Sequence, residues 1–211
     1  ISMNGDIHHA NIVAETIDSV GHKATVTLET HSGSETTVHQ TKGFEFDRGM
    51  VRPHFSTDLA RQRSIYSEAL FTNGAAAYVW LINGRLNSVT QPLMDILNAV
   101  HATGKPLIII AEAIEGEAEM LLVKNRMAGV LNVCPIKAPG FGSARTLMLQ
   151  DLAAFSGATL RRTEEGADLF ADFSLDELGH VKYAEVTQNQ TILIPLEEMS
   201  SSIEDRVEEI D

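Results

Sequence analysis

The sequence predicts an α/β fold, in which a parallel sheet is built from strands that are joined by helices. The main observation is that strand-like and helix-like segments alternate along the chain from Gly43 onward. Strand–helix–strand order is typical of parallel strands connected by crossover helices. A second observation is the composition, because 44% apolar and 21% charged residues are ordinary values for a globular chain.

Three strands and three helices carry this alternation. Short apolar runs predict strands at 76–82, 107–111 and 130–136. Helices are expected after each of them, at 89–102, 116–127 and 143–155. Later strands are expected at 158–161, 181–186 and 191–194, the last two close enough for a hairpin. The acidic segment 197–210 has a helical composition.

The first 41 residues have a different pattern. A short amphipathic helix is expected at 11–20, and two short strands at 25–28 and 36–38 flank a turn. A helix and a hairpin bury little surface by themselves, so this segment must pack on another part of the protein. We therefore expect two domains: a small α+β segment at 1–41 and a larger α/β domain at 42–211.

Charge and composition exclude several classes of function. The formal net charge of −13 on 211 residues disfavours binding to a nucleic-acid backbone. The longest apolar run, 106–111, is too short to cross a bilayer. Because of the charge and this short run, we expect neither a nucleic acid nor a membrane as a partner. The single cysteine, Cys134, excludes an internal disulfide and is expected to be a buried, inert thiol.

Motifs for catalysis, nucleotides or metals are incomplete. Residues 102–105 resemble the end of a phosphate-binding loop, but the required glycine and Ser/Thr are missing at positions 99 and 106. Residues 140–145 resemble a dinucleotide fingerprint whose third glycine is replaced by Arg145. His8 and His9 lack convergent partner ligands. Most of the run of glutamates between 112 and 119 is explained by the N-terminus of a helix. We therefore expect no catalytic residue, cofactor or metal site.

Two of the expected helices have more apolar surface than one sheet face requires. In the helix at 89–102, Met94 shares a flank with Leu97 and lies beside the main apolar stripe. In the helix at 116–127, Met120, Val123 and Met127 extend the apolar surface beyond the core-facing side. Two interpretations remain open: these side chains are simply core, which the pattern alone favours, or they line an apolar groove between neighbouring helices that binds a partner.

Five ordered blocks, with a sixth upstream at 12–21, resemble the group I chaperonins, the GroEL family. The blocks are Gly43–Gly49 with Pro53 and Phe55, Gly104–Glu112, Glu115–Ala118, Lys137–Gly142 and Met148–Ala153. The resemblance implies that 1–41 is part of an intermediate domain. It also implies that 42–211 is an apical, polypeptide-binding domain with an incomplete C-terminal part, in a layered α/β fold.

The same resemblance implies a molecular chaperone, an ATP-dependent ring chaperonin that captures non-native polypeptides and assists their folding. ATP and Mg would be bound by the equatorial domain of the full-length parent, a chaperonin ATPase. This segment would lack the ATP site and the catalytic aspartate, and so no cofactor is expected in it. The implied partners are non-native polypeptides, further copies in a homo-oligomeric ring and a GroES-type cochaperonin. The implied location is the cytoplasm of a bacterium or of a phage-infected host, or alternatively an organelle matrix.

The resemblance also assigns a polypeptide-binding groove. The matching positions are Met50, His54, Phe55, Met94, Leu97, Glu119, Val123 and Lys124. Glu119 and Lys124 stand where the family usually has aliphatic residues, so we expect a preference for more polar segments and weaker recognition of a standard cochaperonin. These two residues favour the alternative of a divergent homologue that acts as a specialised partner-binding or scaffold protein. A third hypothesis, an α/β enzyme or small-ligand binder, has no complete motif.

Overall fold

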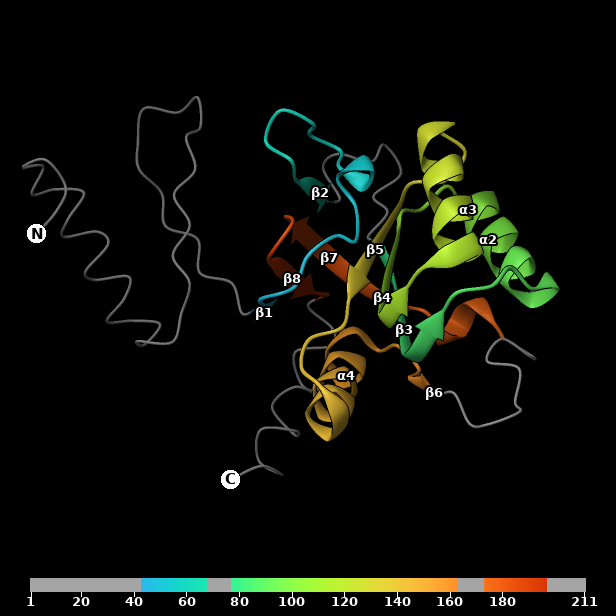
Figure 1. Ribbon diagram of the computed structural model, residues 1–211. Coiled ribbons are helices and arrows are strands. Elements are labelled where there is room, and N and C mark those ends of the chain that lie inside the picture. Colours follow the sequence, from blue (N-terminus) through green and yellow to red (C-terminus); the bar gives the residue numbers. More distant parts are fainter. Residues whose placement is uncertain (1–42, 68–76, 163–172, 197–211) are drawn as a thin grey trace, which may run out of the picture. The chain divides into compact units, whose positions relative to one another are not determined.

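Figure 1 shows the computed structural model of the chain. The structure describes residues 43–67, 77–162 and 173–196. By its internal contacts the chain divides into two units, residues 1–42 and Gly43–Asp211, and all described residues belong to the second. The helix and strands expected within 1–41, and the helical segment expected at 197–210, lie outside the described residues.

The described strands form one mixed sheet. They are β1 (Phe44–Phe46), β2 (Ser64–Ser67), β3 (Ala77–Leu86), β4 (Leu107–Ile114), β5 (Val133–Lys137), β6 (Arg161–Arg162), β7 (Gly179–Val186) and β8 (Thr191–Pro195). The order is β1-β8-β7-β3-β4-β5, with β2 also paired to β7 and β6 to β3. Strands β3, β4 and β5 are parallel, as expected from the alternation, and β7 and β8 form the expected antiparallel hairpin.

In the described part of the chain three helices cover the sheet: α2 (Gln91–Thr103), α3 (Gly116–Met127) and α4 (Gly142–Ser156). The steps from β3 to β4 and from β4 to β5 run in the same direction, so right-handed crossovers place α2 and α3 on one face. The return from β5 to β6, beside β3, runs in the opposite direction and places α4 on the other face. Figure 1 shows this layered α/β arrangement.

The core lies along the parallel strands. Five consecutive residues of β4, from Leu107 to Ala111, are completely buried, and Val79 to Ile82 of β3 are buried in the same way. Parallel strands that are covered on both faces are expected to be apolar throughout rather than alternating. This burial explains why these two strands were recognisable as unbroken apolar runs.

Helix α2 begins and ends at clear sequence signals. The Thr90 side chain accepts a hydrogen bond from the Leu93 N–H, and Gly104 closes the helix with a left-handed φ of 69°. Residues 102–105 therefore lie at the carboxyl end of a helix, where the dipole repels a phosphate group. The incomplete phosphate-loop motif is thus explained as a helix C-cap.

An extended segment connects β1 to the short 3-10 helix η1 (Pro53–Phe55) and lies along the edge of β5. The Val51 N–H donates to the Pro135 carbonyl (2.9 Å), and the Met50 N–H donates to the Thr187 carbonyl (2.9 Å). Gly49 permits this close approach, because a Cβ at that position would lie 2.1 Å from the Thr187 carbonyl oxygen. We call residues 50–56 the edge segment.

Candidate functional site

The face formed by the edge segment, α2 and α3 contains all eight of the positions assigned to polypeptide binding. On α2 the core-facing stripe is buried, and Met94 beside it is half-buried. On α3, Ala118 and Leu122 are buried and Val123 is half-buried, in contact with the core. The exposed surface of α3 is rich in methionine, because Met120 and Met127 are 73% and 71% exposed.

The structure separates the eight positions into three groups. Met50, Phe55 and Leu97 are buried, with exposed fractions of 5%, 0% and 5%. Met94, Glu119 and Val123 are half-buried, whereas His54 and Lys124 are exposed. The side chains that an incoming chain meets in this conformation are those of the second and third groups.

The buried group corrects the expectation that all of these side chains line an open groove. Leu97 belongs to the core stripe of α2, and Met50 lies in a backbone bridge to Ile136 of β5. Phe55, the last residue of η1, is completely buried, and its carbonyl accepts a hydrogen bond from the buried Ser64 hydroxyl (2.8 Å). The two buried side chains of the edge segment, Met50 and Phe55, hold this segment on the domain.

An ion pair that the sequence analysis did not anticipate joins the edge segment to α3. The Arg52 guanidinium hydrogen-bonds to the Glu119 carboxylate, and this contact raises the pKa of Arg52. The Glu119 side chain is only 12% exposed, whereas that of Arg52 is 58% exposed. A nearly buried carboxylate requires a partner of opposite charge. Glu119 stands where the family usually has an aliphatic residue, and this substitution was the signal in the sequence that a cation lies opposite it.

A second arginine anchors the other end of the same segment. Arg126, in the last turn of α3, donates from Nη2 to the Ser56 carbonyl (3.1 Å). The edge segment is therefore attached to the first turn of α3 through Arg52 and to its last turn through Arg126. Neither arginine belongs to a motif, and only the tertiary structure brings them to the segment.

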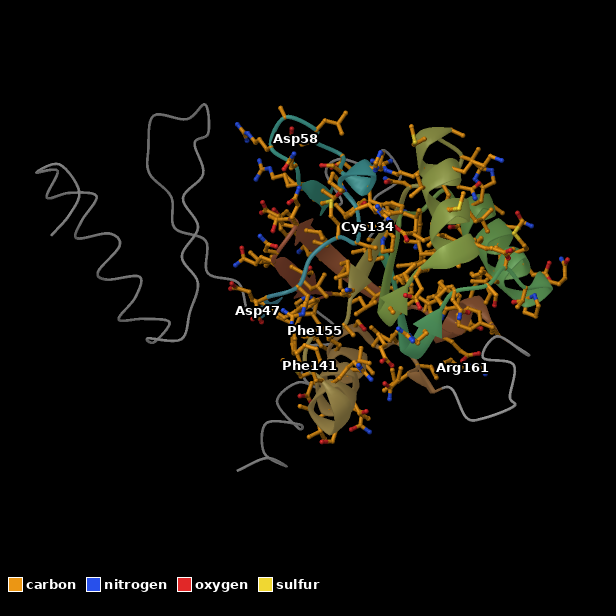
Figure 2. The ribbon with its side chains drawn as sticks, viewed as in Figure 1. Asp47, Asp58, Cys134, Phe141, Phe155 and Arg161 are labelled. Carbon is orange, nitrogen blue, oxygen red and sulfur yellow. The ribbon has the colours of Figure 1, made fainter. Side chains whose placement is uncertain are left out.

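Cys134 lies in β5, beneath this face, and is completely buried, as the sequence predicts. Figure 2 labels its position within the sheet. Burial raises the pKa of the thiol to about 12. A thiol with such a pKa is protonated at neutral pH and is a poor nucleophile.

A hollow of about 550 Å³ adjoins the face. It lies at the carboxyl ends of β3, β4 and β5, where ligands bind in many open α/β sheets. Its lining residues are Val51, Arg52, Pro53, Arg85, Glu112, Ala113, Ile114, Glu115, Glu119, Lys137, Phe141 and Arg145. We call this site the strand-end hollow.

The acidic run that was assigned to a helix N-terminus divides between two roles. Glu117 and Glu119 lie in the first turn of α3, as expected. Glu112 instead lies in β4, where its carboxylate pairs with Arg145 of α4 at 2.9 Å. Glu115 is the N-cap residue of α3 and lies 3.5 Å from the guanidinium of Arg85.

The described residues offer no group of three or more His, Cys, Asp or Glu side chains that could hold a metal ion. His8 and His9 lie outside the described residues. Since residues 102–105 form a helix C-cap, that segment does not fit the phosphates of a nucleotide. None of the helices within the described ranges is long and apolar enough to cross a bilayer.

Comparison with known proteins shows what the chain resembles over its whole length. Chaperonin GroEL of Wolbachia pipientis wMel is 38% identical over all 211 residues, and GroEL of the Wolbachia strain from Brugia malayi is 39% identical over the same span. Over its whole length the chain is similar to part of these GroEL chaperonins. It spans 37% of the length of each of these GroEL relatives. No family model matches the chain.

The GroEL match includes every element of the face described above. A third relative, GroEL of the Wolbachia strain from Drosophila simulans, is 37% identical across the entire chain. The edge segment, α2, α3 and the strand-end hollow therefore all lie within the region that is similar to GroEL.

Proposed function

We propose that this chain is the polypeptide-binding part of a ring chaperonin, and that the exposed face of α3 captures non-native polypeptides. The observation that carries the proposal is the apolar stripe on this helix. Met120 and Met127 are both more than 70% exposed, and Val123 lies between them at helical spacing. Exposed apolar surface of this kind is typical of binding sites for other proteins.

Apolar contact suits a protein that must bind many different chains. Burial of apolar surface is non-directional, so it demands no fixed pattern of hydrogen bonds from the bound segment. Methionine is flexible and polarizable, which lets one surface adapt to different side chains. Met94 of α2 is half-buried and adds to the same face.

Charge should modify what the face accepts. The Glu119 carboxylate is neutralised by Arg52, whereas Lys124 and His54 are exposed. A bound segment with polar or acidic residues can meet these groups without burying an unpaired charge. We therefore propose that the face tolerates more polar segments and binds a GroES-type mobile loop weakly.

The remaining steps belong to the longer protein. Hydrolysis of ATP, bound together with Mg in another part of the longer protein, would supply the energy for release and folding in a homo-oligomeric ring in the bacterial cytoplasm. The whole-length match to GroEL supports this assignment and does not favour the scaffold alternative.

A binding measurement on the 211-residue chain tests the proposal. A fluorescently labelled, permanently unfolded protein is titrated with the chain, and fluorescence anisotropy reports binding. Replacing Met120 and Met127 together by serine should weaken binding about tenfold or more, since each methionine loses its buried apolar contact.

The matched control is Leu59→Ser, which removes a side chain that is 75% exposed and lies outside the face. The control should bind like the unaltered chain. If the control and the methionine variants weaken binding equally, or if the unaltered chain does not bind the unfolded protein, the proposed function is wrong.

A further inference from the structure

The strand-end hollow has polar groups that capture of apolar chain does not use. We propose that it binds an oxyanion, the carboxylate or phosphate group of a ligand, with Lys137 and Arg145 as the hydrogen-bond donors. The ligand is thus recognised by charge, and this goes beyond the apolar capture proposed for α3. The inference stands on the hollow's own residues and does not depend on the proposed function.

The two donors have capacity to spare. Lys137 is exposed at the end of β5, and among the described residues its ammonium group has no ion pair or hydrogen bond. Arg145 uses Nη2 to bind Glu112, but its buried Nε has no acceptor within the described part of the chain. A buried donor without an acceptor is unfavourable. An anion in the hollow supplies the missing acceptor.

The carboxylates of the hollow do not cancel its positive charge. Glu112, Glu115 and Glu119 each pair with an arginine of the lining. The lining contains four cationic and three acidic side chains, so the charge of Lys137 is in excess. A local excess of positive charge attracts anions to the hollow, although the chain as a whole has a net charge of −13.

The β5–α4 loop brings the donors together. Gly140 has a φ of 74°, and a Cβ at this residue would lie 3.1 Å from the backbone nitrogen of Arg145. The loop therefore packs directly on the first turn of α4, so that residues at both ends of the loop reach the same hollow. The glycines that resemble a dinucleotide fingerprint serve this turn.

Phe141 forms the rim of the hollow. It is the N-cap residue of α4 and its ring is 77% exposed. Figure 2 labels it beside the start of that helix. The guanidinium of Arg48 lies 5.6 Å from the centre of the ring, which places one more cation near the entrance.

The oxyanion has two possible sources. A volume of about 550 Å³ leaves room for a carboxylate that is still attached to a peptide, and the hollow shares Arg52 and Glu119 with the polypeptide-binding face. Free inorganic phosphate presents the same oxygen acceptors. Both sources use Lys137 and Arg145, and separate arms of one experiment distinguish them.

The experiment follows backbone amide resonances of the ¹⁵N-labelled 211-residue chain at constant ionic strength. One arm adds inorganic phosphate, and the other adds a short peptide whose central residue is glutamate or glutamine. We expect saturable shifts at Phe141 and Arg145 with phosphate, with the glutamate peptide, or with both. Lys137→Met should weaken the responding arm about tenfold, because a charge-assisted hydrogen bond is lost.

The matched control is Arg61→Met, which removes one positive charge from a side chain that is 70% exposed and lies outside the hollow. This variant should bind like the unaltered chain. A response to phosphate alone identifies a free anion, and a response to the glutamate peptide but not its glutamine analogue identifies a polypeptide carboxylate. The proposal is overturned if neither ligand gives saturable shifts, or if Lys137→Met and Arg61→Met have equal effects.

Discussion

Arg52 and Glu119 are 67 residues apart in the sequence and form an ion pair between the edge segment and the first turn of α3. The pair is asymmetric, because the glutamate side chain is 12% exposed and the arginine side chain is 58% exposed. Loss of Arg52 leaves a nearly buried carboxylate unpaired, whereas loss of Glu119 leaves an arginine that water still solvates. Substitutions of Glu119 are therefore the safer probes of the face.

Glu119→Leu combined with Lys124→Val should increase affinity for an apolar peptide. Each change restores an aliphatic side chain at the face, and burial of one such side chain stabilises a complex by about 1.5–3 kcal/mol at most. We expect binding at least about tenfold tighter in a fluorescence titration. Asp58→Leu with Arg61→Val, which removes an ion pair elsewhere whose side chains are 35% and 70% exposed, is the control. Unchanged affinity of the first variant would count against the assigned groove.

Gly49→Ala should destabilise the domain strongly. The new Cβ would lie 2.1 Å from the Thr187 carbonyl oxygen, and backbone rather than a flexible side chain would have to move. We expect a loss of about 1–3 kcal/mol or more in urea unfolding. Gly104→Ala is the comparison, since it has a φ of 69° but nothing within 4 Å, and it should cost only about 1 kcal/mol. Equal losses would mean that the close approach at Gly49 is not rigid.

Glu177 should make stability depend on acidic pH. Its hydrogen bonds with Arg161 lower the pKa of the carboxyl group in the folded chain. The stabilisation is therefore complete above the unfolded-state value of about 4.3 and is lost as the pH falls through the lower folded-state pKa. Glu177→Gln keeps the capping geometry at Ser174 but removes the charge.

The measurement is the free energy of unfolding as a function of pH. The unaltered chain should lose up to about 1 kcal/mol more than Glu177→Gln as the pH is lowered from 7 to 3. Identical pH profiles for the two chains would show that the Arg161 contact does not stabilise the folded state.

Cys134 should react with an alkylating reagent only after unfolding. Burial raises its pKa to about 12, so the thiolate fraction at pH 8 is about a thousandfold below that of an exposed cysteine, and the sulfur is also inaccessible. Mass spectrometry after iodoacetamide treatment, with and without urea, measures the difference. Rapid alkylation of the native chain would place Cys134 at the surface and contradict its position in β5.

The parallel part of the fold was predictable because local pattern and tertiary role agree there. The helix expected at 116–127 has the same limits in the structure. The strand expected at 107–111 begins at the expected residue and continues further, to Ile114. Strands β1 and β2 were not recognised, since they have three and four residues and exist through pairing with β8 and β7. Their partners are more than a hundred residues away in the sequence.

The sequence predicted which residues lie at the candidate site, but it did not predict which of their side chains are exposed. Helical spacing identified Met120, Val123 and Met127 as surplus apolar surface, and two of them are largely exposed. Phe55 was assigned by the family resemblance instead, and its burial depends on a fold-back of the edge segment that no local pattern encodes. Arg52 was missed for a related reason, since its role depends on Glu119.

The most direct test of polypeptide capture by α3 is the spectrum of the methionine methyl groups during titration with an unfolded protein. We predict that the ¹³C-methyl signals of Met120 and Met127 shift or broaden, together with that of the half-buried Met94. The signal of Met50, which is 5% exposed, should not change, nor should that of Met148 on α4. Unchanged signals from Met120 and Met127 under conditions where the unfolded protein binds would contradict the account.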